Sequence, residues 1–166
     1  MSLDNIQLPG FIIQDLFQKS LVDLSIENPV KSTPKTGIIN YLGGNNQHIT
    51  ILINDPEVTF VSSEQQTFLS GILNACKLNM DDVALINMAA SPTLQYQTII
   101  QVLSPKIILL FGVPTAAIQL PFVIPDFQKQ LHNKQLYLSA PSLNDLENDK
   151  ELKRKLWVLL KEIFSL

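Results

Sequence analysis

The side chains that could do chemistry in this sequence stand directly after apolar runs that are typical of buried strands. In an open α/β sheet, ligands bind beyond the carboxyl ends of the strands, so these residues define a candidate binding crevice. We call it the strand-end crevice, and it consists of Asn54, Asp55, Pro56, Asn87, Gly112, Ala140, Pro141 and Ser142. Acid–base catalysis usually needs two groups of separated proton affinity, and this set holds one carboxylate and no histidine or lysine. It therefore favours binding over catalysis.

The two strongest members of the crevice each have a structural interpretation as well. Asp55 precedes Pro56, and an aspartate in that place commonly holds a turn through its side chain. Asn87, at the end of a strand, could likewise bond to the backbone of a loop. His48 and His132 precede predicted strands, so we expect them near the opposite edge of the sheet or in loops.

The elements that must position these residues follow from hydrophobic periodicity. Apolar runs predict strands, and amphipathic stretches with helical spacing predict helices. The expected strands are 37–43, 48–54, 82–88, 106–112 and 136–140, and the expected helices are 62–78, 93–104, 114–120 and 148–164. Continuous apolar strands that alternate with helices indicate a parallel sheet covered on both faces. We therefore expect an α/β fold, a three-layer α/β/α domain over residues 37–166 with a mostly parallel sheet of about four strands.

Two polar pairs are expected to cap predicted helices. Ser63 with Gln66 stands at the start of the 62–78 helix, and Asn148 with Glu151 at the start of the 148–164 helix. Each pair has the spacing of a reciprocal cap, in which both side chains satisfy free backbone N–H groups.

Residues 1–36 are expected to form a separate N-terminal segment, an amphipathic helix over 9–24 followed by a proline-bearing linker. Its apolar stripe predicts partner binding through Ile12, Ile13, Leu16 and Phe17. The stripe is wide enough to pack against the sheet, against a second copy or against another protein.

Composition narrows the classes of function. Lysine and arginine number 12 against 15 aspartates and glutamates, and a nucleic-acid binder usually carries a basic surface, so direct DNA contact stays an open question. The single cysteine, Cys76, excludes an intrachain disulfide and a multi-cysteine metal site, and it lies in an apolar helical pattern typical of core packing. We expect neither a metal nor a cofactor. No apolar run reaches about 18 residues, so we expect no membrane span and a cytoplasmic location.

The order of four motifs resembles that of the uracil-DNA glycosylases. "ILINDPEV" (51–58) resembles their first motif, "LNMDDVALINM" (78–88) the approach to their base-recognising asparagine, "SPKIILLFG" (104–112) a later strand, and "SAPSLND" (139–145) their His-Pro-Ser motif. The likeness spans roughly residues 48–166. It implies a glycosylase-like fold.

The resemblance implies a role for several positions. Asp55 falls on the aspartate that positions water and Asn87 on the asparagine that reads the uracil edge, which would be the catalytic pair of an active enzyme. Glu57 stands where the pocket tyrosine would be, and Ala140 replaces the histidine that stabilises the departing uracil. Losing such a donor typically costs about 10²–10³ in rate. Phe68 could be proposed as the base-stacking aromatic, but its helical pattern favours the core.

A non-catalytic branch of the same fold is also similar. "SAPSLNDLENDKELKRKLW" (139–157) resembles the C-terminal stretch of the psi subunits of bacterial DNA polymerase III clamp loaders, and "ITILINDPEV" (49–58) resembles their preceding unit. In that family an N-terminal segment docks a partner in the clamp loader.

We therefore expect a non-catalytic protein-interaction role of the psi type, with clamp-loader or single-strand-binding proteins as partners. The alternatives are a diverged DNA glycosylase that acts on uracil or a damaged base, and a binding module for a nucleotide or small ligand. A homo-oligomer is compatible with each of them.

Overall fold

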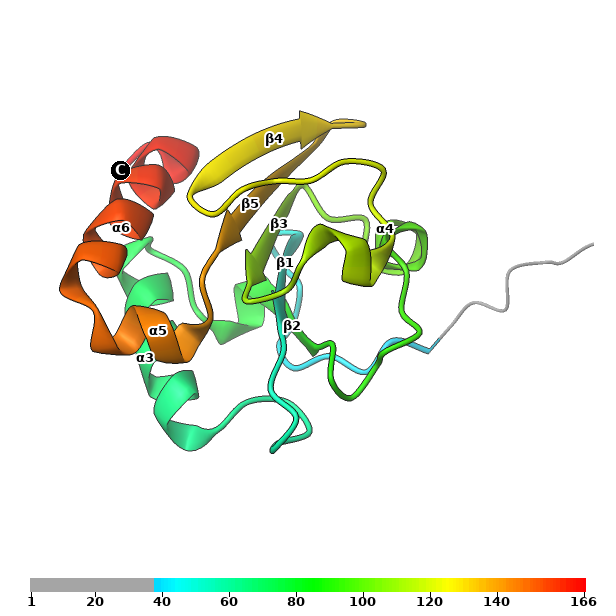
Figure 1. The fold of residues 1–166 in the computed structure, drawn as a ribbon, viewed down its shortest axis with the longest axis horizontal. Coiled ribbons are helices and arrows are strands. Elements are labelled where there is room, and N and C mark those ends of the chain that lie inside the picture. The colour runs from blue at the N-terminus through cyan, green and yellow to red at the C-terminus, as the bar shows by residue number, and fades with distance from the viewer. Residues whose placement is uncertain (1–37) are drawn as a thin grey trace, which may run out of the picture. The chain divides into compact units, whose positions relative to one another are not determined.

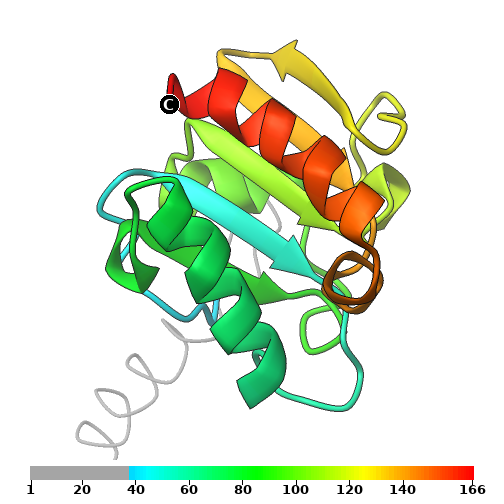
Figure 2. The same ribbon diagram turned by 90° about the vertical axis from the view of Figure 1, so that its left-hand side faces the viewer.

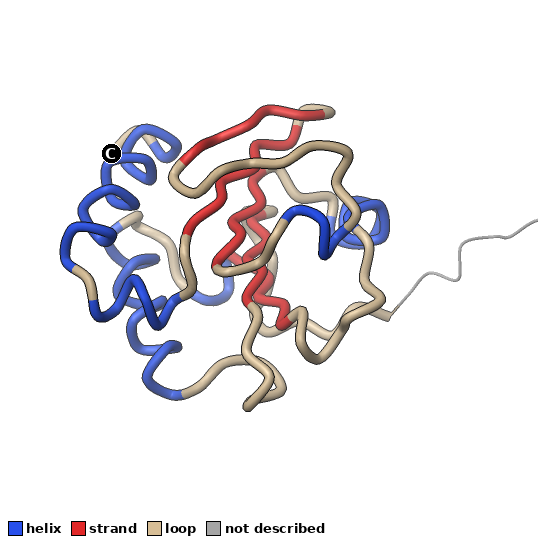
Figure 3. Tube along the Cα trace, viewed as in Figure 1, coloured by secondary structure: helices blue, strands red, loops and turns tan. Residues whose placement is uncertain are grey.

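The computed structural model describes residues 38–166, which form an α/β fold around one central sheet (Figures 1 and 3). The predicted N-terminal helix and linker lie outside the described residues, and so do Ile12, Ile13, Leu16 and Phe17. The elements are, in chain order, β1 (Ile49–Ile53), α3 (Ser63–Ala75), the 3-10 helix η1 (Met80–Asp82), β2 (Val83–Asn87), α4 (Tyr96–Leu103), β3 (Ile107–Phe111), the 3-10 helix η2 (Thr115–Ile118), β4 (Gln128–His132), β5 (Gln135–Ala140), α5 (Leu143–Asn148) and α6 (Lys150–Phe164).

The sheet has the strand order β2-β1-β3-β5-β4. β1, β2, β3 and β5 run parallel, as the apolar runs predict, and β4 pairs antiparallel with β5 at one edge. The described sheet thus has five strands, and our expectation of about four was wrong. The additional strand β4 (QKQLH) is mostly exposed and lacks an apolar pattern. Asn133 and Lys134 join it to β5 with φ values of 49° and 69°, which is the backbone of a tight hairpin turn.

The strand expected at 37–43 does not form in the residues described there. Leu42 makes only an isolated antiparallel bridge to Leu85. Gly43 follows at φ +111°, and a Cβ on it would lie 2.2 Å from the carbonyl oxygen of Val83. The chain therefore turns tightly against β2 after one bridge, although its sequence is apolar enough for a strand.

Helices cover both faces of the sheet. Figures 1 and 2 show α3, α5 and α6 on one face, and Figure 1 shows α4 on the other. Successive strand residues point into two cores, because side chains alternate along a strand. Ile51 packs in the core beneath α3 and α6 with Leu69 and Leu156, whereas Leu52 packs in the opposite core with Ile99. Burial on both faces explains why the parallel strands are continuously apolar.

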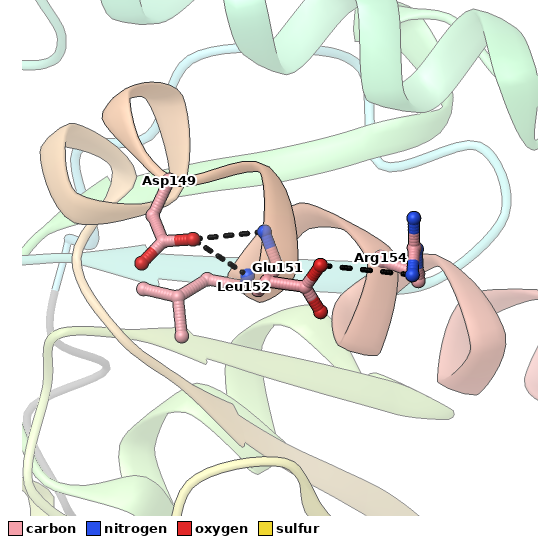
Figure 4. A network of polar contacts seen from close by, with 4 residues as sticks. All are labelled: Asp149, Glu151, Leu152 and Arg154. Carbon is pink, nitrogen blue, oxygen red and sulfur yellow. Dashed lines mark hydrogen bonds and ion pairs between the residues drawn. The ribbon is translucent and has the colours of Figure 1, made fainter.

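Both predicted caps are displaced by one residue. Ser62, rather than Ser63, accepts the backbone N–H of Gln65 at 3.3 Å and begins α3. Asp149, rather than Asn148, begins α6 by accepting the N–H groups of Glu151 and Leu152 at 2.8 and 3.3 Å (Figure 4). In each case two neighbouring residues have cap-forming side chains, and sequence spacing alone does not separate them.

One helix was not expected, and one expected helix is shorter. The helix expected at 148–164 forms as α6, and the additional short helix α5 precedes it, with Asp149 between them. The helix expected at 114–120 is the single 3-10 turn η2, which ends at Gln119 with φ 58°. Within residues 38–166, no helix combines the length and the apolar content that crossing a membrane requires.

Candidate binding site at the strand ends

The carboxyl ends of β1, β3 and β5 meet at one edge of the sheet, since these strands are parallel. There the strand-end crevice is divided between two cavities. Asn54, Asp55 and Pro56 line a cavity of about 280 Å³, which we call the Asp55 cavity. Gly112, Ala140 and Pro141 line one of about 610 Å³, which we call the Ala140 cavity, and Ser142 borders both. Asn87 lines neither.

The Asp55 carboxylate is held on both of its oxygens. Oδ1 accepts the backbone N–H of Glu57 at 3.0 Å, which forms the turn that leaves β1. Oδ2 accepts Nε2 of Gln65 at 3.0 Å, from the first turn of α3. Phe111 and Leu143, both buried, also line this cavity. Asp55 is therefore oriented by its neighbours and still has lone pairs for another donor.

Gln65 is a site residue that our sequence interpretation missed. Its side chain is only 6% exposed, and Nε2 bridges the Asp55 carboxylate and Oδ1 of Asn144, at 3.0 and 2.9 Å. Its Oε1 is buried without a hydrogen-bond partner among the described residues. A signal was present, because Gln65 stands four residues before Leu69 and eight before Leu73 on the buried stripe of α3.

The Asn87 side chain makes all of its hydrogen bonds to backbone groups of the surrounding loops. Its Oδ1 accepts the backbone N–H groups of Asp55 and Ala89 at 3.0 and 3.1 Å. Its Nδ2 donates to the carbonyl oxygens of Asp55 and Val58 at 2.7 and 2.6 Å. An amide side chain has two donor hydrogens and two acceptor lone pairs, so its hydrogen-bonding capacity is filled. At 2% exposure, Asn87 clamps the loops after β1 and β2.

The Ala140 cavity is shaped by small residues and turns. Ala140 is 2% exposed at the end of β5. Gly112 has φ +64°, and a Cβ on it would lie 2.9 Å from Cβ of Ser142, so glycine is required for the close approach of the two loops. Ser142 caps α5 by accepting the N–H of Asp145 at 3.2 Å and donates to the carboxylate of that residue at 2.7 Å. Ser139 donates to Asp126 at 3.1 Å.

The charge of the site is negative. Asp55 and Glu57 line the first cavity, and Asp126 and Asp145 line the second, whereas no lysine, arginine or histidine lines either one in the part of the chain described. These four carboxylates favour a cationic or donor-rich binding partner and disfavour a polyanion.

The remaining candidate residues lie away from this edge. His48 precedes β1, and His132 ends the antiparallel β4 beside the start of β5, so both are near the opposite edge, as expected. Cys76 is buried in the core beneath α3, as predicted, and burial raises the pKa of its thiol to about 11. Phe68 packs partly buried against the same core, and Nζ of Lys153 lies 5.3 Å from its ring centroid.

Among residues 38–166, no three histidine, cysteine, aspartate or glutamate side chains converge to form a metal site. No protein-family model matches the chain, and the search of curated proteins found no match to its sequence.

Proposed function

We propose that this chain is a non-catalytic protein-interaction domain with a glycosylase-like three-layer α/β/α fold, of the kind found in psi subunits of bacterial clamp loaders. The saturation of Asn87 is the observation that carries the proposal. In a glycosylase this position reads the edge of the base, and reading requires free donor and acceptor atoms. Here all of them are bonded to backbone groups of the chain itself.

Two further features of the strand-end edge support the proposal. Ala140 stands where the resemblance expects a histidine, and a methyl group cannot stabilise charge on a departing base. Four carboxylates line the two cavities, which repels a polyanionic substrate. A diverged glycosylase, with Asp55 positioning water and Asn87 holding the base, would have to break the loop clamp in order to act.

The proposed partners are clamp-loader or single-strand-binding proteins. The predicted apolar stripe of residues 9–24 would supply apolar contacts, and the strand-end crevice would supply polar contacts through Asp55 and Ser142. Asp55 keeps acceptor capacity beyond its two bonds, so it suits a donor side chain from a partner.

Pull-down with the full immobilised chain tests this function. We expect clamp-loader proteins to be retained from cell extract, and retention to be lost in the double variant Ile13→Asp/Leu16→Asp. The matched variant Gln14→Asp/Gln18→Asp, which changes polar positions of the same segment, should retain them. Eluates without replication proteins would contradict the proposal.

The Asp55 cavity favours a second candidate, a small-ligand binding module. Its volume of about 280 Å³ and its Asp55 carboxylate could hold a compact ligand that carries hydrogen-bond donors. Thermal unfolding with candidate nucleotides tests this function, because a ligand at 100 times its dissociation constant stabilises the fold by about 2.7 kcal/mol. An unchanged unfolding midpoint at high ligand concentration would contradict it.

A further inference from the structure

An apolar groove lies between α3 and α6, on the sheet face that Figure 2 turns toward the viewer. α3 packs against α5, and α5 packs against α6, whereas the space between α3 and α6 is a cavity of about 350 Å³. We call it the α3–α6 groove. Its apolar lining comes from Phe68, Ile72, Trp157 and Leu160. It shares no lining residue with the two strand-end cavities.

The α3 side of this groove is made of small residues. Thr67, Gly71 and Ala75 all line it, at intervals of four residues, so they form one stripe along the helix. Packing within the described chain does not require glycine at position 71, because a Cβ there would meet nothing within 4 Å. Glycine inside a helix is unfavourable, and here it leaves a surface that another helix backbone can approach closely.

One lysine of α6, Lys153, lines the groove, and a second, Lys161, lies next to the groove residue Trp157. Nζ of Lys153 lies 5.3 Å from the Phe68 ring centroid, and Nζ of Lys161 lies 5.3 Å from that of Trp157. Neither lysine forms an ion pair with a described residue, whereas Arg154 on the same helix pairs with Glu151. Two unpaired cations beside an apolar groove are complementary to an apolar helix face bordered by carboxylates.

We infer, building on the proposed interaction function, that the α3–α6 groove docks an acidic amphipathic helix of a partner protein. α3 has 13 residues and is therefore about 20 Å long, which matches a partner helix of about three to four turns. The partner's large apolar side chains enter between Phe68 and Trp157, and its carboxylates meet Lys153 and Lys161. This is the helix-in-groove mode of recognition.

Trp157 is the only tryptophan in the sequence and lines the groove, so its fluorescence reports occupancy directly. The probe is a synthetic amphipathic helix without aromatic residues, with leucines on one face and glutamates on both sides of them. Added to the full chain, this peptide should shift Trp157 emission to shorter wavelength and protect the indole from fluorescence quenching by acrylamide. A peptide with lysine for every glutamate should do neither.

Three variants make the test specific. Gly71→Leu fills the groove from an open position, so it should weaken peptide binding by about tenfold or more while the thermal midpoint is kept. Lys153→Glu/Lys161→Glu should exchange the preference, so that the basic peptide binds and the acidic one does not. Arg154→Glu, a charge reversal on the same helix outside the groove, should leave binding of the acidic peptide within about twofold.

An acidic peptide that leaves Trp157 emission unchanged up to about 1 mM would overturn the inference. If Ile13→Asp/Leu16→Asp shifts that emission without peptide, the groove is occupied by residues 9–24 of the chain itself. A shift on dilution of the protein alone would assign it to a second copy, and either result overturns the inference as well. Any of these results would leave the proposed function standing. That function is tested separately, by the pull-down above and by an assay of uracil excision from DNA.

Discussion

Asn87 and Asp55 show how two residues that suggest chemistry are used to build loops. The amide of Asn87 joins the segments after β1 and β2 through four bonds to backbone groups, and Asp55 holds the turn at Glu57. The structural interpretation of both residues follows from their places at strand ends, where the chain must satisfy buried backbone groups.

Replacing Asn87 with alanine should therefore destabilise the fold strongly. The change removes a buried amide and leaves partly buried backbone groups of Asp55, Val58 and Ala89 without partners, and we expect a loss of about 3 kcal/mol in the free energy of unfolding. Urea unfolding measures it. Asn54→Ala, at the exposed end of β1, should change stability by less than about 0.5 kcal/mol. Equal effects of the two changes would contradict the loop clamp.

The contribution of Tyr137 to the stability of the fold should depend on pH. Its ring is fully buried, and its hydroxyl has no hydrogen-bond partner among the described residues. Burial, together with the nearby Tyr96, raises the pKa of Tyr137 from 10.0 to about 12. The unfolded chain therefore loses this proton first, and the free energy of unfolding falls as the pH rises from 10.0 through about 12.

We expect Tyr137→Phe to stabilise the fold by about 1 kcal/mol at neutral pH, because it removes an unpaired buried hydroxyl. Its advantage over the parent chain should increase above pH 10.0, since phenylalanine has no proton to lose. Urea unfolding of both chains at neutral and alkaline pH measures the difference. A constant difference across that range would show that Tyr137 does not titrate as described.

At the scale of elements, what the sequence predicts depends on how apolar each segment is. The ends of the four buried strands were predicted to within about two residues, because a short continuous apolar run is typical of a strand that is covered on both faces. β4 was missed because an exposed edge strand needs no apolar side chains, and its pairing depends on the hairpin turn at Asn133. The burial of Gln65 follows from its place on the stripe of α3, but its bond to Asn144 could not be predicted, because Asn144 is 79 residues away in the sequence.

Replacing Gly71 or Gly112 with alanine should have opposite effects on the stability of the fold. Gly71→Ala should stabilise α3 by about 0.5–1 kcal/mol, because the added Cβ meets open space inside a helix. Gly112→Ala should destabilise the fold by about 1 kcal/mol or more, since φ is +64° there and the Cβ approaches Ser142. Thermal or urea unfolding distinguishes them. A loss of stability in Gly71→Ala would mean that the position is already occupied.

For residues 38–166 as a whole, two surfaces that share no lining residue differ in charge. The carboxyl edge of the strands presents Asp55, Glu57, Asp126 and Asp145. Lys153 lines the α3–α6 groove, and Lys161 lies next to it over the Trp157 ring. An enzyme for a polyanionic substrate would place cations around its reaction site, whereas no described lysine, arginine or histidine lines the two strand-end cavities. This arrangement supports the proposed interaction domain with two separate contact surfaces.

Uracil excision from single-stranded DNA tests the central claim most directly. The full chain and the variant Asp55→Asn are incubated with a uracil-containing oligonucleotide, and abasic sites are scored by strand cleavage with alkali. We expect both proteins to match the rate measured without protein, because Asn87 is fully bonded and the Ala140 side chain has no hydrogen-bond donor. Excision by the parent chain that Asp55→Asn abolishes would contradict the non-catalytic account.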